Sequence, residues 1–348
     1  MRVLVTGGAG FIGGHIVEQL VAAGHDTVVL DSLVAHDAPP TDLPSEARCV
    51  WGDVRDHDAW RTALAGGVDA VSHQAARVGL GKDFADVDAY VSDNALGTAV
   101  GLRVLHEVGF AGRFVLASSM VVYGDGSYEC SIDGAGIRPG PRRAGDLADG
   151  RYDPRCPRCG GALRWVAIDE DAALAPRSVY AATKLHQEHL VSVFGAEHRA
   201  SVVALRYHNV YGPRMPRDTP YAGVAAIFRS ALEAGRAPQV LEDGGQVRDF
   251  VHVRDVARAN LLALTATDPP GVCNVASGKP RTILDLAAAM HEALGASADL
   301  TPVVVGGTRG GDVRHIVASA ERAATLLGFR AEIPFEEGIA EFVASPMR

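Results

Sequence analysis

The sequence predicts an α/β fold in which a doubly wound parallel sheet is joined to a smaller mixed α/β lobe. Three observations support this prediction. Short apolar segments of strand length alternate with amphipathic segments of helix length over roughly the first 207 residues. The first apolar segment runs directly into a glycine-rich turn, and the alternation is interrupted once, at residues 125–172. Beyond residue 208 the segments become shorter and mixed, which is typical of a second lobe.

The elements of the sheet are predicted from apolar runs bounded by glycine, aspartate or other polar residues. Strands are expected at residues 2–6, 27–30, 47–51, 70–71, 113–117 and 201–206. Helices are expected at residues 12–23, 86–107 and 180–194. Because crossovers between parallel strands are right-handed, the carboxyl ends of these strands, and any ligand, should share one edge of the sheet.

The composition is that of a well-packed globular protein. Its 348 residues are 47% hydrophobic, and no apolar run approaches the roughly 20 residues that span a bilayer. The net charge of −9 disfavours nucleic acid or an anionic membrane as the main partner. The apolar N-terminus is interrupted by glycines and makes a poor signal peptide. We therefore expect a cytoplasmic protein whose cysteines are free thiols or metal ligands.

A glycine-rich turn follows the first expected strand. Gly7, Gly10 and Gly13 are spaced G-x-x-G-x-x-G, and Phe11 and Ile12 open the helix that follows. Glycines at a strand-to-helix turn let the backbone approach a pyrophosphate, which the helix N-terminus attracts. The alternative is a tight turn without a ligand. We interpret it as a dinucleotide site, because it both follows a strand and opens a helix.

An acidic residue distinguishes between the two nicotinamide cofactors. Asp31 follows the second expected strand, where a carboxylate can accept hydrogen bonds from the adenosine ribose hydroxyls. A 2′-phosphate would be repelled there, so the sequence predicts NAD rather than NADP. Asp53 and Val54 lie where an adenine edge is expected, although Asp53 could equally cap its own loop. Weaker candidates for cofactor contacts are Ala75, Ala76 and Asn94.

Tyr180 and Lys184 place a phenol and an ammonium group one helical turn apart. A tyrosine base needs its pKa lowered from about 10, and Lys184 together with an oxidised nicotinamide would stabilise the phenolate. Ser119, at the end of an expected strand, could bridge a substrate oxygen and Tyr180. The alternative, an ordinary pair on a helix surface, is common for Y-x-x-x-K alone. The glycine-rich turn and Ser119 favour the catalytic interpretation.

Together these residues resemble the extended short-chain dehydrogenase/reductase family, in its nucleotide-sugar epimerase and dehydratase branch. The resemblance covers nearly the whole chain apart from the insertion at 125–172. It rests on residues 7–13, Ser118-Ser119 with Tyr123-Gly124, Tyr180 with Lys184, Asn209 with residues 211–214, and residues 248–253. It implies a tightly held NAD, a triad of Ser119, Tyr180 and Lys184, and a sugar nucleotide bound between two lobes.

The resemblance also implies how the chain is divided. Residues 1–207 would form an NAD-binding Rossmann domain, interrupted by the insertion, with residues 249–275 returning to it. Residues 208–348 would form mainly the sugar-nucleotide lobe. In many relatives two long helices, here about 86–107 and 178–195, pair with those of a second subunit, so a homodimer is expected.

The reaction is predicted from the residues that follow Ser119. Dehydratases of the family carry acidic or hydroxylic helpers there, whereas this chain has Met120 and Val121, which cannot donate or accept a proton. A 4-epimerase needs only the triad, NAD and room for a 4-keto intermediate to rotate. We therefore expect epimerisation at C4. The alternatives are a 4,6-dehydratase, a ketosugar reductase and a cofactor-sensing binding protein.

Several residues are expected to contact the substrate. The resemblance places Asn209 and Val224 near it and assigns Arg248 and Arg309 to the diphosphate, which guanidinium groups can hold bidentately. Alternatively, Asn209 forms a turn and either arginine is a solvated surface charge. Residues 220–224, residues 241–244 and the insertion are similar to those of the dTDP-L-rhamnose 4-epimerases, which make a 6-deoxy-L-talose nucleotide. UDP-hexose and UDP-uronate 4-epimerases share most of the same motifs and remain alternatives.

The insertion contains three of the five cysteines. Cys156 and Cys159 form a C-x-x-C-G turn typical of zinc knuckles, and Cys130 could be a third ligand. A closed site needs four ligands, and residues 125–172 contain no histidine and no further cysteine. Asp133 or a side chain from elsewhere would have to complete the site. The alternatives are a knuckle without metal or a protein-binding lid, and any zinc is expected to be structural.

Overall fold

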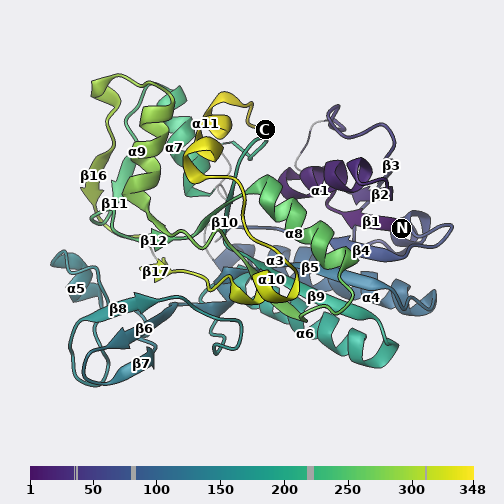
Figure 1. Ribbon diagram of the computed structural model, residues 1–348, viewed down its shortest axis with the longest axis horizontal. Coiled ribbons are helices and arrows are strands. Elements are labelled where there is room, and N and C mark those ends of the chain that lie inside the picture. The colour runs from purple at the N-terminus through teal and green to yellow at the C-terminus, as the bar shows by residue number, and fades with distance from the viewer. Residues whose placement is uncertain (35, 37, 80–83, 218–222, 310–311) are drawn as a thin grey trace.

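The computed structural model describes residues 1–34, 36, 38–79, 84–217, 223–309 and 312–348. At its centre is a seven-stranded parallel sheet in the order β14-β9-β5-β4-β1-β2-β3 (Figure 1). Its strands are β1 (Arg2–Thr6), β2 (Asp26–Asp31), β3 (Arg48–Trp51), β4 (Ala70–His73), β5 (Arg113–Ser119), β9 (Ser201–Tyr207) and β14 (Val272–Val275). The strand order runs outward in both directions from β1, and the predicted doubly wound sheet is confirmed.

Helices cover both faces of this sheet (Figure 1). One face carries α1 (Phe11–Ala22), α8 (Val253–Thr265) and α10 (Glu321–Leu326), and the other carries α2 (His57–Ala63), α4 (Gly97–Glu107) and α6 (Val179–His198). Side chains alternate along a strand, so Val3 and Val5 of β1 pack with the first set and Leu4 with the second. Because both faces are covered, all three side chains are fully buried.

The strand registers align the carboxyl ends along one edge. Thr6 of β1 lies opposite Leu30 of β2 and His73 of β4, and Ser119 of β5 lies opposite Tyr207 of β9. The glycine-rich turn and the loop that carries Ala75 and Ala76 follow directly from these strand ends, and Ser119 is the last residue of β5. β14 is the edge strand beyond β9, so the chain re-enters the main sheet late. The predicted domain boundaries stay a prediction.

The helix expected at residues 86–107 is not uniform. It consists of η1 (Phe84–Asp86), α3 (Val87–Tyr90), a π-helical segment η2 (Val91–Leu96) and α4. A π segment widens the helix locally, and such segments are frequent at functional sites. The side chain of Asn94 is fully buried within it. Apolar periodicity alone does not distinguish such a segment from a regular helix.

The second lobe consists of short paired strands and helices with a core of their own, which includes Phe228, Leu286 and Phe342. Its elements are β10 (Asn209–Tyr211), α7 (Val224–Glu233), β11 (Gln239–Leu241), β12 (Val247–Arg248), β13 (Phe250–His252), β15 (Arg281–Thr282), α9 (Ile283–Ala293), η4 (Ala298–Leu300), β16 (Val303–Gly306), β17 (His315–Ile316) and α11 (Phe335–Ala344). Across the described residues, no helix combines the length and apolar character needed to cross a bilayer.

The insertion forms a small unit after β5 and the short 3₁₀ helix η3 (Met120–Tyr123). Its antiparallel sheet has the order β7-β6-β8, and Figure 1 shows it beside the second lobe and away from α1. Its elements are β6 (Ser127–Cys130), β7 (Gly134–Ile137), α5 (Ala144–Ala148) and β8 (Leu163–Val166). The buried residues of its core are Tyr128, Cys130, Ile137 and Cys156.

Candidate active site

The glycine-rich turn joins β1 to α1, and its backbone leaves no room for side chains. A Cβ added at Gly13 would lie 2.0 Å from the carbonyl oxygen of Gly7, and one at Gly7 would lie 2.7 Å from the backbone nitrogen of Ala75. Gly7 also has a φ of +69°, which favours glycine, and Gly10 caps α1. A turn without Cβ atoms in front of a helix N-terminus fits the pyrophosphate of a dinucleotide.

Three further cofactor candidates lie around this turn. Phe11 packs against the core of the second lobe and Ile12 against that of the sheet, so α1 begins where the two cores meet. The Asp31 carboxylate, at the end of β2, accepts hydrogen bonds from the backbone N–H groups of Ala9, at 3.0 Å, and Leu33, at 2.8 Å. These bonds hold the turn against β2. The predicted contact with the adenosine ribose hydroxyls would be made by this same carboxylate.

Asp53 and Val54 lie in the loop after β3. The Asp53 carboxylate accepts a hydrogen bond from the Arg55 backbone at 2.8 Å and pairs with the Arg55 guanidinium at 2.6 Å, which lowers the pKa of Asp53. The Val54 carbonyl accepts a hydrogen bond from the Trp60 indole at 2.8 Å. Asp53 therefore has the loop-capping contacts of the alternative interpretation, and the cofactor contacts stay a prediction.

The loop after β4 carries Ala75 and Ala76, both half-buried, and Asn94 holds this loop in place. The Asn94 side chain accepts a hydrogen bond from the Arg77 N–H at 2.7 Å and donates to the Arg77 carbonyl and to the Thr183 hydroxyl, both at 3.0 Å. Its polar atoms connect the loop to α6. Asn94 thus supports the position of the cofactor candidates, whether or not it also contacts a cofactor.

His73 is a residue of this region that the sequence analysis did not single out. Its ring nitrogens lie 2.7 Å from the Thr6 hydroxyl and 2.9 Å from the Thr98 hydroxyl. Burial, reinforced by the charge of Lys184, lowers the pKa of His73 to about 3, so the imidazole is neutral. It ties the end of β1 to α4. Its place at the carboxyl end of a strand was a usable signal.

The structure brings the three candidate catalytic residues together. Tyr180 lies in the first turn of α6, close enough to the Ser119 side chain for that residue to lower the pKa of the phenol. The Lys184 ammonium lies 5.9 Å from the centre of the Tyr180 ring and donates a hydrogen bond to the Ala117 carbonyl at 2.8 Å. Ser119 and Ala117 belong to β5, so one strand end positions both the serine and the lysine.

In the protein without a cofactor, burial is the main influence on the pKa of the Tyr180 phenol. Burial raises the pKa of Tyr180 to about 12, and the hydrogen bond with Ser119 opposes this shift. Burial also lowers the pKa of Lys184 to about 7, against the attraction of Glu188. Desolvation disfavours the charged form of each group, so it raises the pKa of the phenol and lowers that of the ammonium. A phenolate here needs an additional positive charge.

A buried hydrogen-bond network lies behind the triad. The Ser118 hydroxyl donates to the Glu188 carboxylate at 2.5 Å, and Glu188 is paired with Arg206 at 2.8 and 2.9 Å. Arg206 also donates to the Tyr123 hydroxyl at 3.0 Å, which in turn donates to Asn274 at 2.7 Å. The network connects β5, α6, β9 and β14. Two of its members, Ser118 and Tyr123, belong to the motif on which the family resemblance rests.

Two of the substrate candidates are buried in different ways. Asn209 lies on β10, and its side-chain oxygen is buried without a hydrogen-bond partner among the described residues, which leaves an acceptor for a ligand. The Arg248 guanidinium donates to the carbonyls of Val247, Val313 and Arg314 at 2.6–2.9 Å. Arg248 therefore holds the chain around β17 here, and its expected diphosphate contact stays a prediction.

Arg309 lines a pocket of about 390 Å³ between the insertion and the second lobe. Three more arginines line it, each paired with a carboxylate: Arg142 with Glu242, Arg177 with Asp125, and Arg314 with Asp243. The Arg309 side chain is exposed. Val224 starts α7 and packs against the core of the second lobe. Residues 220–222, which belong to the segment 220–224 used above, and residues 310–311, which follow Arg309, lie outside the described residues.

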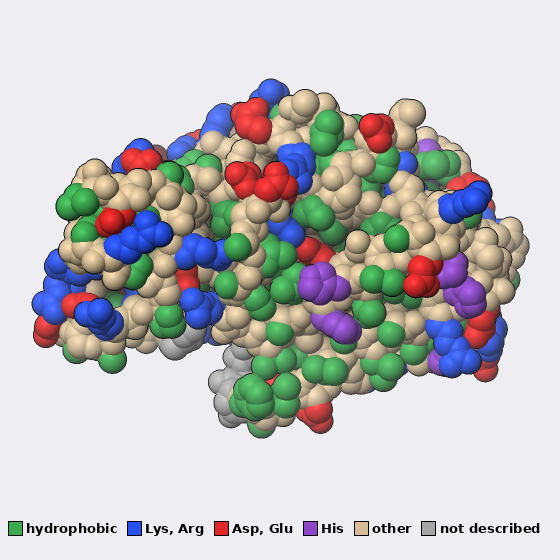
Figure 2. Space-filling model, turned by 90° about the horizontal axis from the view of Figure 1, so that it is seen from below, with side chains coloured by type: hydrophobic (Ala, Val, Ile, Leu, Met, Phe, Trp, Pro, Cys, Tyr) green, Lys and Arg blue, Asp and Glu red, His purple; other side chains and the backbone are tan. Residues whose placement is uncertain are grey.

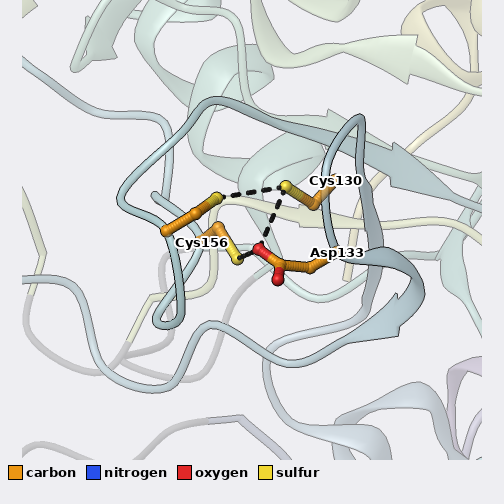
Figure 3. Close-up of side chains that lie close together, drawn as sticks. Cys130, Asp133 and Cys156 are labelled. Atoms are coloured by element: carbon orange, nitrogen blue, oxygen red, sulfur yellow. Dashed lines mark hydrogen bonds between the residues drawn. The ribbon is translucent and has the colours of Figure 1, made fainter.

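The cysteines predicted as metal ligands also converge. One ligand atom each from Cys130, Asp133, Cys156 and Cys159 lies within 4.8 Å of the others (Figure 3). Asp133, the residue suggested from the sequence as a fourth ligand, points its carboxylate at the thiols of Cys130 and Cys156. The cluster lies in the insertion, away from Tyr180.

Comparison with protein families gives a match over most of the chain. Residues 3–140 and 161–276 match the NAD dependent epimerase/dehydratase family. The stretch between the two matched parts, residues 141–160, lies within the insertion and contains Cys156 and Cys159. The insertion is therefore partly outside the common framework of the family.

Individual relatives cover nearly the full length. The chain is 32% identical to the dTDP-L-rhamnose 4-epimerase of Burkholderia thailandensis, over 98% of this chain and 93% of that protein. It is 32% identical to the solved UDP-glucose 4-epimerase of Thermus thermophilus in complex with NAD, with a TM-score of 0.77 and 99% and 98% of the two chains covered. The UDP-glucose 4-epimerase of Thermotoga maritima, solved with UDP-glucose, is 26% identical, with a TM-score of 0.79 and the same coverage.

These matches extend over both lobes of the chain. The chain belongs to the NAD dependent epimerase/dehydratase family, and its predicted membership of the extended short-chain dehydrogenases/reductases is confirmed.

Proposed function

We propose that the protein is an NAD-dependent nucleotide-sugar 4-epimerase that interconverts dTDP-L-rhamnose and dTDP-6-deoxy-L-talose. The observation that carries this proposal is the convergence of Ser119, Tyr180 and Lys184 at the carboxyl end of β5. Oxidation and re-reduction at one carbon require a proton acceptor at one oxygen and no second acid or base. The relative with 32% identity over nearly the whole chain supports the choice of sugar.

NAD would fit the turn formed by Gly7, Gly10 and Gly13, because residues without a Cβ let the backbone approach a pyrophosphate. An added Cβ at Gly7 or Gly13 would lie less than 3.0 Å from backbone atoms. Asp31, which is bonded to this turn through Ala9, would hold the adenosine ribose hydroxyls. When bound, NAD supplies a hydride acceptor in its oxidised form and a hydride donor in its reduced form.

Tyr180 would move the proton of the reaction. As a phenolate it takes the proton of the sugar O4 while C4 loses a hydride, and it returns that proton when the hydride comes back to the opposite face. Ser119, which is hydrogen-bonded to Tyr180, would hold O4 in reach. Lys184 stabilises the phenolate by its charge, which the Ala117 carbonyl keeps in place. Burial raises the pKa of Tyr180, and the positive charge of an oxidised nicotinamide would favour the phenolate against this shift.

The residues after Ser119 favour epimerisation over dehydration. Met120 and Val121 form the start of η3 and carry no group that could protonate a leaving hydroxyl. Incubation with dTDP-glucose followed by base treatment tests this point. A dehydratase would give the ultraviolet absorbance of a 4-keto-6-deoxy product, whereas we expect none.

The sugar and the nucleotide are tested together by NMR with a panel of dTDP- and UDP-sugars. We expect dTDP-L-rhamnose to be converted to its C4 epimer faster than UDP-glucose, UDP-N-acetylglucosamine or UDP-glucuronate. Faster conversion of a UDP-hexose or a UDP-uronate would support the epimerase activity but would assign it a different substrate. Absence of any interconversion would contradict the proposed function as a whole.

We further propose that the protein acts as a cytoplasmic homodimer through the helices around η2 and α6. Val91, Leu96 and Val193 on these helices expose 47%, 51% and 57% of their surface. Figure 2 shows hydrophobic and histidine side chains gathered over the middle and lower part of the face seen from below. Exposed apolar side chains on paired helices fit a four-helix interface. Light scattering coupled to gel filtration should give twice the 36.5 kDa chain mass.

A further inference from the structure

The four clustered side chains of the insertion come from two turns of similar design. Cys130 and Asp133 are separated by two residues at the β6–β7 turn, and Cys156 and Cys159 have the same spacing before β8. The first turn directs the Ile132 N–H at the Cys130 sulfur, at 3.5 Å. In the second, the Gly160 N–H bonds the Cys156 carbonyl at 2.8 Å. We propose that these two facing turns bind one structural zinc ion through three thiolates and one carboxylate.

The distances between the ligand atoms suit a tetrahedral ion. The Cys130 and Cys159 sulfurs are 3.4 Å apart, and the Asp133 carboxylate oxygen lies 3.1 Å from Cys156 and 3.6 Å from Cys130 (Figure 3). Zinc–sulfur bonds of about 2.3 Å in a tetrahedron separate two sulfurs by about 3.8 Å. All four ligand atoms lie within 4.8 Å of one another, so small rotations of the side chains would complete the site.

The insertion also needs a link of this kind to be ordered. Among the described residues, its buried core consists of Tyr128 and Ile137 besides two of the cysteines, with Leu163 and Trp165 half-buried against them. Small units of this size, here the 48 residues 125–172, often rely on disulfides or a metal when their apolar core is small. Cys156 and Cys159 lie in the stretch that the family match omits, which agrees with a local addition that carries its own means of stabilisation.

The zinc would fix one wall of the pocket beside Arg309. The chain between Asp133 and Cys156 carries Arg142, which pairs with Glu242 at 2.6 Å, and Asp153, which pairs with Arg314 at 2.7 Å. Both contacts connect the insertion to the second lobe, and Arg142 and Arg314 line the pocket. The site is therefore structural. Its existence does not depend on the proposed function, whereas its influence on substrate binding rests on that function.

Metal analysis of the full-length protein, purified under reducing conditions without chelator, tests the proposal independently of turnover. We expect about one zinc per chain by inductively coupled plasma mass spectrometry, lost in Cys156→Ser and kept in Cys49→Ser, whose cysteine lies on β3 outside the cluster. Cobalt exchanged into the wild-type protein should give tetrahedral d–d bands and thiolate charge-transfer absorption. In Asp133→Cys the charge-transfer absorption should increase, because a fourth thiolate replaces the carboxylate.

The cobalt spectrum of the wild-type protein keeps the test valid if Cys156→Ser fails to fold. A wild-type protein that takes up neither zinc nor cobalt would overturn the proposal, as would an octahedral cobalt spectrum. A Cys130–Cys159 disulfide found by mass spectrometry in metal-free, natively purified protein would also overturn it, because the two sulfurs would then be linked without an ion.

Discussion

The parallel sheet and the insertion are stabilised in different ways. In the sheet, Val3, Leu4 and Val5 are fully buried between two large apolar cores, and each such side chain contributes roughly 1.5–3 kcal/mol. The insertion buries few apolar side chains and is held by ion pairs and by the cluster around Asp133. The comparison teaches that a rigid, self-sufficient part carries the candidate catalytic residues, whereas a tethered part shapes the neighbouring pocket.

The largest effect is expected in the rigid part, from Tyr180→Phe. We expect kcat to fall by about 10³-fold, because the group that exchanges a proton with O4 is removed. NAD binding by calorimetry and the melting temperature should remain close to wild type. Tyr152→Phe removes a phenol on the insertion side and is the matched control, with kcat within about twofold. Turnover of Tyr180→Phe at the wild-type rate would refute the assigned role of Tyr180.

Gly13→Ala tests how closely the glycine-rich turn is packed. Its Cβ would lie 2.0 Å from the Gly7 carbonyl oxygen, so the backbone must move and the cradle must open. We expect NAD affinity to fall at least about tenfold and stability to fall by about 3 kcal/mol. In Gly14→Ala, one residue later in α1, the nearest atom would be 3.6 Å away. Stability there should be unchanged or should rise by up to about 1 kcal/mol.

Gly14→Ala is the control and should keep the wild-type NAD affinity in a fluorescence titration. If Gly13→Ala also keeps it, the turn does not approach the cofactor, and the dinucleotide interpretation loses its main structural support.

Acid should destabilise the sheet and the second lobe before it affects the insertion. Burial lowers the pKa values of His73, His208 and His252 to about 3, whereas the unfolded chain binds these protons below about pH 6.5. Stability from these neutral histidines is complete above pH 6.5 and is lost as the pH falls toward 3. At pH 5 each histidine should cost about 2 kcal/mol.

Urea unfolding between pH 5 and 7.5 measures this loss. In His73→Gln the free energy of unfolding should depend less steeply on pH. An unchanged slope would show that His73 has the same pKa in the folded and unfolded states. Residues 125–172 contain no histidine, so peptide-resolved hydrogen exchange of the insertion should change least over this range.

The smallest effect is expected from loosening the tethered part. Under the zinc proposal, Cys156→Ser should raise KM for the nucleotide sugar roughly fivefold, equivalent to about 1 kcal/mol, and leave kcat within about twofold. Hydrogen exchange should increase in β6 and β8 and not in β1 or β5. Cys49→Ser is the control. A fall in kcat without a change in KM would indicate that the insertion takes part in the chemistry and not in the pocket wall.

Local signals were sufficient for the framework of the site. The alternation of strands and helices, the three glycines of the turn and the spacing of Tyr180 and Lys184 depend on residues close together in the chain, and each was predicted. Membership of the family and dependence on NAD followed from these motifs and are confirmed at the level of the family. The choice among sugars stays a proposal, because no local pattern encodes the shape of a pocket built from three segments.

The sequence by itself determined the sheet, the cofactor turn and the candidate triad, since side-chain periodicity and turn chemistry act over a few residues. Only the tertiary structure decided that Ser119 meets Tyr180, that Arg248 donates to backbone carbonyls, and that Asp133 faces Cys156. It also decided that burial dominates the pKa of Tyr180. Desolvation and contacts between distant segments depend on how the whole chain packs, which no local pattern specifies.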